Sequence, residues 1–265
     1  LATTGNGGNV ENSNGYDIVF ADTDGDTKLD HELQNYNPTT GKITAHVKIP
    51  SLPSSVDKVI YIYYGNSTIS VDQSTTNTWS NGYEAVLHLQ ESGSGVTDEF
   101  NDSSGNGIHG TGGGLPGSGD NTQTPDQATD SIFGSYSQDY NASNPDLIRT
   151  QDFDVTGFDE ITVECWIKPD TADQGRLVSN GWGTSYDDNS YNLKLDDVDF
   201  EVRHRTSVQS HSGPNAGTIS TTNWQFVAYT WVGQTTGSNN LKLYQDGGAP
   251  VGQDSINGTS MYQTP

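Results

Sequence analysis

This sequence can form neither an intrachain disulfide bond nor a long hydrophobic helix. The chain has a single cysteine, Cys165, among its 265 residues, so no disulfide can form within it. Cys165 lies in the alternating segment Ile161–Ile167, which predicts a buried and unreactive thiol. No apolar run approaches the roughly 20 residues that a membrane helix needs. If the protein is extracellular, metal ions or tight Gly and Asn turns must make it rigid instead.

Positively charged residues are scarce. The chain has 11 lysines and arginines against 34 aspartates and glutamates, which gives a formal net charge of −23. A surface this acidic repels phosphate backbones and anionic lipids, so we expect neither nucleic-acid binding nor membrane insertion. It attracts divalent cations, although solubility alone explains the charge equally well.

Apolar residues are also few, at 30% of the chain, yet the aromatic content argues against disorder. The sequence has 13 Tyr, 5 Trp and 7 Phe, placed in alternating runs, and it shows almost no helical periodicity. We therefore predict an all-β fold in which Trp166, Trp224 and Trp231 belong to the core. The expected strands are Tyr16–Phe20, Lys42–Ile49, Val56–Tyr64, Glu84–Leu89, Ser131–Tyr136, Ile161–Lys168, Arg176–Val178, Tyr191–Leu195, Val198–Arg203, Trp224–Trp231 and Leu241–Tyr244.

Two segments consist mostly of turn residues. Ser92–Asp130 contains Gly and Pro clusters and is expected to be a long surface loop. Gly65–Asn81 is rich in Ser and Thr and reads as a connection between domains. We place a boundary near Thr78, so that one domain covers residues 1–78 and the other residues 79–265.

The second domain opens with Trp79 and Glu84-Ala85-Val86-Leu87-His88-Leu89, which lead to an acidic, glycine-rich loop at Asn101–Gly110. Three further segments follow along the chain, Ile161–Pro169, Trp224–Ala228 and Leu241–Gly247. Together and in this order they resemble the laminin-G-like, concanavalin-A-like family, with Gln225 where His is usual. The resemblance implies a jelly-roll β-sandwich on an extracellular protein, which binds or assembles rather than catalyses.

The first domain contains Tyr16–Phe20, the acidic stretch Asp22–Asp26 and Tyr61–Asn66. These segments are similar to an uncharacterised β domain that often precedes laminin-G-like domains in archaeal and bacterial surface proteins. We thus expect two β-sandwich domains, each lacking edge strands at its end of the chain. Either the remaining strands belong to the same polypeptide or a neighbouring subunit supplies them.

Acidic turns suggest calcium as a cofactor. Asp22, Asp24, Asp26 and Asp30 alternate around a glycine as in a calcium loop, although the match to an EF-hand is imperfect. The alternative is an Asp-rich turn whose side chains cap local N–H groups. Asp102 and Asn106 flank a second such turn, for which a self-hydrogen-bonded turn is equally expected. The His and Cys residues do not have the spacing of a zinc site.

A loop with a glycine-flanked tryptophan is the candidate carbohydrate-binding site. Trp182 could stack on a sugar ring while neighbouring polar groups bind hydroxyls, and the alternative is a tryptophan folded onto the sandwich edge. The residues of this candidate are Trp182, Tyr186, Asp187 and Asn189. Four sequons in predicted loops are candidate glycosylation sites, at Asn66, Asn101, Asn141 and Asn257.

Catalytic motifs are absent, including the nucleophile elbow, the phosphate loop and the dinucleotide fingerprint. Asp197, Asp199 and Glu201 have the alternate spacing that glycosidases of this fold use, but an amphipathic edge strand has the same pattern. We therefore expect a secreted or cell-surface, non-catalytic module for adhesion, glycan binding or matrix assembly. Its partners would be polysaccharide or neighbouring subunits. The alternatives are a structural subunit of a filament or surface layer, and a glycoside hydrolase or its accessory module.

Overall fold

A computed structural model describes residues 1–114, 119–141, 143, 146–151, 154–181 and 190–263. The described elements are strands and three short 3₁₀ helices, which confirms the predicted all-β class. The chain divides into two compact units, Leu1–Asp152 and Phe153–Pro265. The expected boundary near Thr78 lies inside the first of these units and stays a prediction.

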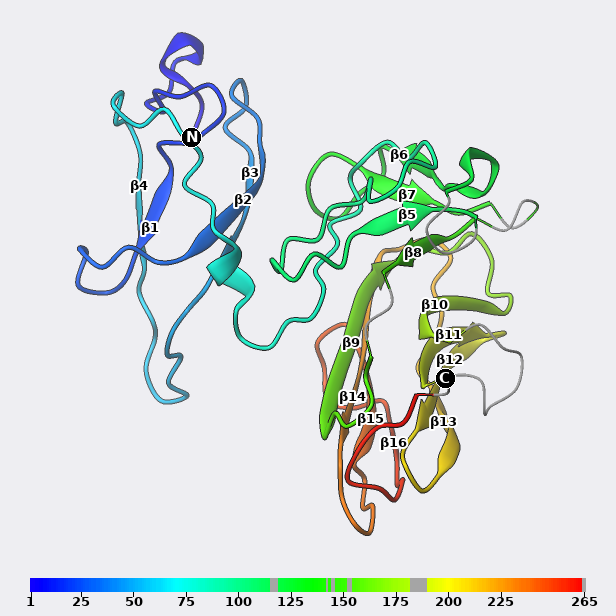
Figure 1. Ribbon diagram of the computed structural model, residues 1–265. Helices are drawn as coiled ribbons and strands as arrows, with labels where there is room; N and C mark the ends of the chain where they lie inside the picture. The colour runs from blue at the N-terminus through cyan, green and yellow to red at the C-terminus, as the bar shows by residue number, and fades with distance from the viewer. Residues whose placement is uncertain (115–118, 142, 144–145, 152–153, 182–189, 264–265) are drawn as a thin grey trace. The chain divides into compact units, whose positions relative to one another are not determined.

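The first unit is built from two-stranded antiparallel ladders, drawn in blue to green in Figure 1. A small apolar cluster of Val10, Ile18, Phe20 and Leu29 forms the core beside the first two ladders. The ladders are β1 (Val19–Ala21) with β4 (Tyr61–Tyr63), β2 (His31–Tyr36) with β3 (Ile43–Val47), β5 (Gly110–Gly112) with β8 (Ile148–Thr150), and β6 (Asp126–Ala128) with β7 (Ser137–Asp139). The 3₁₀ helices are η1 (Thr4–Asn6), η2 (Thr76–Trp79) and η3 (Asn121–Gln123).

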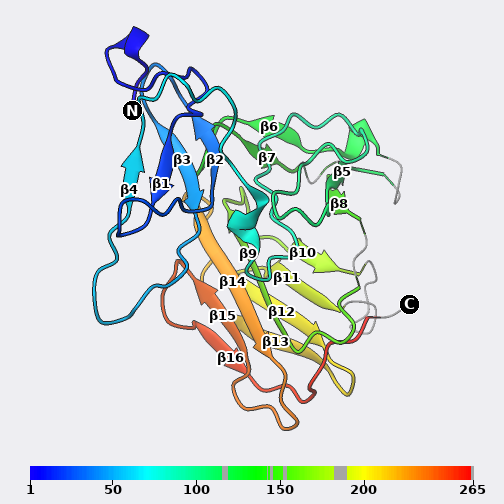
Figure 2. The ribbon, with the colours of Figure 1, turned by 60° about the vertical axis from the view of Figure 1, so that its left-hand side comes forward.

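The second unit is a β-sandwich of two four-stranded antiparallel sheets, which Figures 1 and 2 show as separate layers. One sheet has the order β16 (Gly252–Asp254), β15 (Leu241–Gln245), β14 (Gln225–Val232), β9 (Glu160–Ile167). The other has the order β10 (Gly175–Asn180), β11 (Tyr191–Asp196), β12 (Asp199–Arg205), β13 (Ser210–Ala216).

Both sheets of the second unit contribute to one apolar core. Leu193 and Phe200 come from one sheet, and Tyr229 and Leu243 come from the other, all fully buried. Because alternate side chains of a strand point to opposite faces, the other half of each strand faces outward. Cys165 packs at the margin of this core, where burial raises the pKa of its thiol to about 12, in agreement with an unreactive cysteine.

Several local expectations were wrong. Glu84–Leu89 forms no strand in the described structure and makes one isolated bridge, from Leu87 to Asp102. The segment Ser131–Tyr136 consists of bends that precede β7, and the supposed loop Ser92–Asp130 contains β5, η3 and β6. Trp231 is fully buried as expected, but Trp166 is 38% exposed on the outer face of β9, where its ring lies 5.5 Å from that of Phe226.

Candidate functional site

The register of β11 and β12 separates an apolar face from a polar one. Leu193 pairs with Val202 and Leu195 pairs with Phe200, and these side chains enter the core. The alternate pairs, Asn192 with Arg203 and Lys194 with Glu201, therefore lie on the outer face of the sheet. β13 extends that face, since Asn215 pairs with Glu201 and Ser212 pairs with Arg203.

Ion pairs and hydrogen bonds join six of these side chains, and Asn192 lies among them by strand register. We call the set the outer-face cluster (Asn192, Lys194, Asp196, Glu201, Arg203, Ser212 and Asn215). Lys194 Nζ lies 2.7 Å from Glu201 Oε2 and 2.8 Å from Asp196 Oδ1. Arg203 Nε donates to Glu201 Oε1 at 3.0 Å, and the Ser212 hydroxyl donates to the same oxygen. Asn215 Nδ2 donates to Asp196 Oδ2 at 3.0 Å.

The charges of the outer-face cluster hold each other in place. Burial alone would raise the pKa of Glu201, but hydrogen bonds from Arg203, Lys194 and Ser212 outweigh it and lower that pKa. Burial would lower the pKa of Lys194, but its bonds to Asp196 and Glu201 raise it above the ordinary value. Both side chains are thus ionised at neutral pH. Asp199 differs, because burial and then the carboxylates of Asp196 and Glu201 raise its pKa.

Buried and exposed polar groups meet on this face. Asn192 is 1% exposed, and neither its amide oxygen nor its amide nitrogen has a hydrogen-bond partner within the described part of the chain. Ser212 and Asn215 are exposed, as is Arg176 on β10. The ionic cluster fixes the orientation of Asn215 and Ser212, and such fixed donors and acceptors can bind hydroxyl groups of a ligand.

Two of the four aspartates of the first acidic turn, Asp22 and Asp24, use their carboxylates to bond to nearby groups of the same unit. Asp22 pairs with Lys58 and accepts from Thr23 N at 2.5 Å. Asp24 accepts from the backbone and hydroxyl of Thr27 and from Asp26 N. Among the described residues, the carboxylates of Asp26 and Asp30 add no hydrogen bond or ion pair to the turn. Within these residues no three His, Cys, Asp or Glu side chains form a metal-binding group, and calcium here stays a prediction.

Asp102 organises the second acidic turn. Its carboxylate is buried and accepts from the backbone N–H groups of Val86, Ser104 and Ile108 and from the Ser104 hydroxyl, at 2.7–3.0 Å. The Asn106 amide donates to the carbonyls of Tyr83 and Glu84. These bonds match the self-bonded turn, and calcium binding at this turn stays a prediction.

The remaining candidates from the sequence are the carbohydrate-binding residues and the glycosylation sequons. Trp182, Tyr186, Asp187 and Asn189 fall outside the described residues. Asn66, Asn101, Asn141 and Asn257 are all exposed and lie outside strands. Asn66 and Asn141 use their side-chain oxygens to accept from the backbone two residues later. Glycosylation of the four sequons stays a prediction.

A polar cluster around Glu32 was not expected from the sequence; we call it the Glu32 hub (Glu32, His46, Trp79, His88 and Ser103). The Glu32 carboxylate accepts from Trp79 Nε1 at 2.7 Å and Ser103 Oγ at 2.7 Å, and its Oε2 lies 3.0 Å from His88 Nε2. The His46 ring stacks on that of His88 at 5.0 Å. Burial and the charge of His88 lower the pKa of His46. The hub anchors η2 and the following segment to β2.

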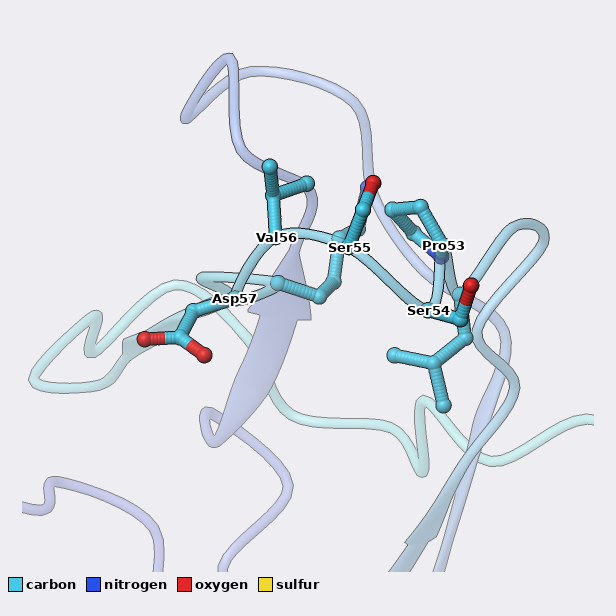
Figure 3. A pocket seen from close by; sticks show the side chains of 7 residues that line it. Pro53, Ser54, Ser55, Val56 and Asp57 are labelled. Carbon is cyan, nitrogen blue, oxygen red and sulfur yellow. The ribbon is translucent and has the colours of Figure 1, made fainter.

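One shallow concavity lies on the segment before β4. Figure 3 shows the side chains of Pro53, Ser54, Ser55, Val56 and Asp57 around it, and Leu52 and Lys58 complete its lining. All seven residues are consecutive, and neither the Glu32 hub nor the outer-face cluster contributes to it.

Comparison with protein families identifies the sandwich. Residues 142–263 match the concanavalin A-like lectin/glucanases superfamily. This concanavalin A-like match includes β9 to β16 and therefore the whole outer-face cluster. Residues 14–111 match a domain of unknown function (DUF2341), a span that includes the whole Glu32 hub and continues past Thr78. The two matches come in the predicted order. No curated protein matches the chain significantly.

Proposed function

We propose that this chain is a non-catalytic carbohydrate-binding module of a secreted or cell-surface protein, used in adhesion or matrix assembly. The observation that carries the proposal is the outer-face cluster, which lies on one sheet of a concanavalin A-like sandwich. Lectin-like sites need polar groups held in fixed positions, because a flexible side chain loses entropy when it binds a hydroxyl. None of the helices in the described residues is long and apolar enough to cross a membrane.

Both hydrogen-bond donors and acceptors lie on this outer face. On β13, Asn215 offers an amide and Ser212 a hydroxyl, and on β10, at the opposite edge of the same sheet, Arg176 offers a guanidinium. Sugars present hydroxyls that donate and accept, so this mixture suits them better than a surface of one charge sign. The aromatic side chain of Trp182 is proposed to add stacking to the polar contacts, as the sequence suggested.

Binding is favoured over catalysis by the surroundings of Glu201. A glycosidase needs one carboxylate free to attack or to activate water and a second one to donate a proton. Asp199 and Glu201 share a face, and their pKa values are shifted in opposite directions, as such a pair requires. However, both oxygens of Glu201 are engaged by Lys194, Arg203 and Ser212. Glycoside hydrolysis is therefore the second candidate, and release of reducing sugar from polysaccharides would favour it.

Glycan-array binding of the full chain, followed by calorimetric titration, tests the proposal. We expect Asn215→Ala to weaken glycan binding about tenfold, since it removes a fixed donor near the sugar. Asn223→Ala is the matched control, because Asn223 is an exposed asparagine in the turn before β14. Trp182→Ala tests the stacking contribution separately.

Two results would contradict the proposal. The first is the lack of any glycan signal with or without calcium. The second is a glycan affinity unchanged by Asn215→Ala and Trp182→Ala together. A filament or surface-layer subunit is the remaining alternative, and assembly of the purified chain without added glycan would favour it.

A further inference from the structure

Asparagine is followed by glycine at six places in the chain. This dipeptide is prone to spontaneous deamidation, because glycine has no Cβ to shield its backbone nitrogen from the preceding side chain. The reaction needs that nitrogen free of hydrogen bonds and the asparagine side chain free to turn toward it. The pairs begin at Asn6, Asn14, Asn81, Asn106, Asn180 and Asn257. Their surroundings in the fold therefore decide which of them react.

The pair Asn81-Gly82 meets both conditions. It lies in the turn that follows η2, and both residues are exposed. Among the described residues the Gly82 N–H has no hydrogen-bond partner, and neither has the Asn81 side chain. Gly82 has a φ of 82°, and no described atom lies within 4 Å of where its Cβ would stand. The attacking nitrogen and the side chain that it attacks are therefore both unhindered.

Hydrogen bonds restrain the other pairs. At Asn6 and Asn257 both reacting groups are engaged. Each side-chain amide makes a hydrogen bond of 2.8 Å, and the N–H of the following glycine donates to a backbone carbonyl, at 3.2 Å after Asn6 and 2.9 Å after Asn257. The glycine after Asn14 donates to Asn12 O at 2.9 Å. The Asn106 amide donates to two carbonyls, which hold it away from the main chain that follows.

We propose that Asn81 is a site of spontaneous covalent modification, at which the Gly82 nitrogen attacks the Asn81 side chain. The nitrogen forms a bond to Asn81 Cγ and gives up its proton, the Cγ–Nδ2 bond breaks, and ammonia leaves. The product is a cyclic succinimide. Water then adds to one of the two ring carbonyls, and the ring opens to aspartate or to isoaspartate. Only water and base are consumed, so no enzyme or oxidant is needed.

The modified position lies between two residues that the Glu32 hub holds. Asn81 follows Trp79 by two residues, and the chain returns to the hub at His88. Both products add a negative charge to the turn, and isoaspartate also adds a methylene to the main chain between these two residues. The modification stands independently of glycan binding, since Asn81 belongs to the first unit and the outer-face cluster to the second.

Peptide mapping of the full chain by mass spectrometry, after incubation of the folded protein at mildly alkaline pH, tests the proposal. The readout at each pair is the mass increase that accompanies replacement of an amide by a carboxyl group. We expect Asn81 to react at least about tenfold faster than Asn6, Asn14, Asn106 and Asn257, because those sites must open locally before they react. Asn180 adjoins residues outside the described part of the chain, so the ranking covers the other five sites.

A parallel sample in urea is the control for the fold, and there the five sites should react at similar rates because unfolding removes their hydrogen bonds. Labelling of the folded chain by an isoaspartate methyltransferase gives a second readout. Asn81→Gln should abolish the early labelling, since glutamine would have to close a larger ring. Asn6→Gln is the matched control and should leave the labelling unchanged.

Three results would overturn the proposal. The first is a folded chain in which Asn81 reacts no faster than Asn6 and Asn257, or does not react while the urea sample does. The second is methyltransferase labelling that Asn81→Gln leaves unchanged. The third is the same lead of Asn81 over the other sites in urea, because the local sequence and not the fold would then select the site.

Discussion

Single buried polar side chains hold much of this fold together. Asp102 links three backbone N–H groups and the Ser104 hydroxyl, from segments on both sides of its own turn. Burial would raise the pKa of Asp102, but these hydrogen bonds outweigh it and lower the pKa below the ordinary value. The carboxylate is therefore ionised in the folded protein at neutral pH, and its contribution to stability is lost only as the pH falls below about 4.

We expect Asp102→Ala to destabilise the first unit by about 3 kcal/mol, because it leaves several buried donors without an acceptor. Urea unfolding at pH 7 measures the change. Asp72→Ala is the control, since Asp72 is exposed and, among the described residues, accepts a hydrogen bond only from Ser74 N two residues later. Equal effects of the two substitutions would show that Asp102 is no more than a local turn residue.

His204 gives the second unit a pH dependence. It is buried between the rings of Tyr229 and Trp231, and neither ring nitrogen has a hydrogen-bond partner among the described residues. Burial, together with the neighbouring His211, lowers the pKa of His204 to about 3. An unfolded histidine titrates near 6.5, so below that pH the unfolded chain binds a proton that the folded chain excludes.

Stability of the second unit should therefore be full above pH 6.5 and fall as the pH is lowered toward 3. We expect a loss approaching about 1.4 kcal/mol per pH unit between pH 6 and pH 5, measured by urea unfolding. His204→Phe should flatten this slope. Tyr191→Phe is the control, because it also alters a buried ring near Tyr229 but removes no group that titrates in this range. An unchanged slope in His204→Phe would refute the assignment.

At the scale of elements, the Glu32 hub determines how η2 is anchored. Trp79 is the last residue of η2, and its indole N–H donates to Glu32 on β2. The backbone of Thr75, just before the helix, donates to His31 O at 2.9 Å. A four-residue 3₁₀ helix is not stable by itself, so these contacts fix its position.

Trp79→Phe should increase amide hydrogen exchange in residues 76–89 at least about tenfold, since it removes the bond to the Glu32 carboxylate and leaves that oxygen with fewer donors. Exchange detected by mass spectrometry checks this, with Trp224→Phe as the control in the other unit. No change in exchange would mean that ring packing, rather than the hydrogen bond, holds the helix.

Elements with alternating apolar residues were predictable, and the others were not. β11, β12, β14 and β15 lie within two residues of the expected ranges, because Val, Leu, Phe and Tyr alternate along them. β13 was missed because its Ser, Gly, Pro and Asn residues have low strand propensity. Pairing with β12 imposes its conformation, with a register shift between Glu201 and Arg203.

The outer-face cluster and the Glu32 hub were likewise predictable only in part from the sequence. Alternation placed Asp199 and Glu201 on one face, as the sequence indicated. Asp197, expected on the same face, lies instead in the turn before β12, with a φ of 63°. The partners Lys194, Ser212 and Asn215 depend on strand register, which no local pattern reveals. The Glu32 hub joins Ser103 to a residue 71 positions earlier in the sequence, so only tertiary structure brings it together.

For the whole molecule, the net charge of −23 predicts a response to cations. We expect millimolar calcium to raise the melting temperature, and to raise it more than magnesium or sodium chloride of equal ionic strength if a specific site exists. General screening of the acidic surface acts with all three salts alike. Melting curves in chelator and in each salt distinguish the two cases, and identical shifts would remove calcium as a cofactor.

Two separate apolar cores should make the chain unfold in two steps. Ile18 is buried in the small core of the first unit, and Leu193 is buried in the sandwich core of the second. Calorimetry should resolve two transitions. Ile18→Ala should shift only one transition to lower temperature and Leu193→Ala only the other. Each substitution should reduce the free energy of unfolding of its unit by about 2–5 kcal/mol, since each leaves a cavity in one core. Val208→Ala, at an exposed position, should change neither. If each substitution lowers both transitions together, the two units unfold as one cooperative structure and the division between Asp152 and Phe153 has no thermodynamic meaning.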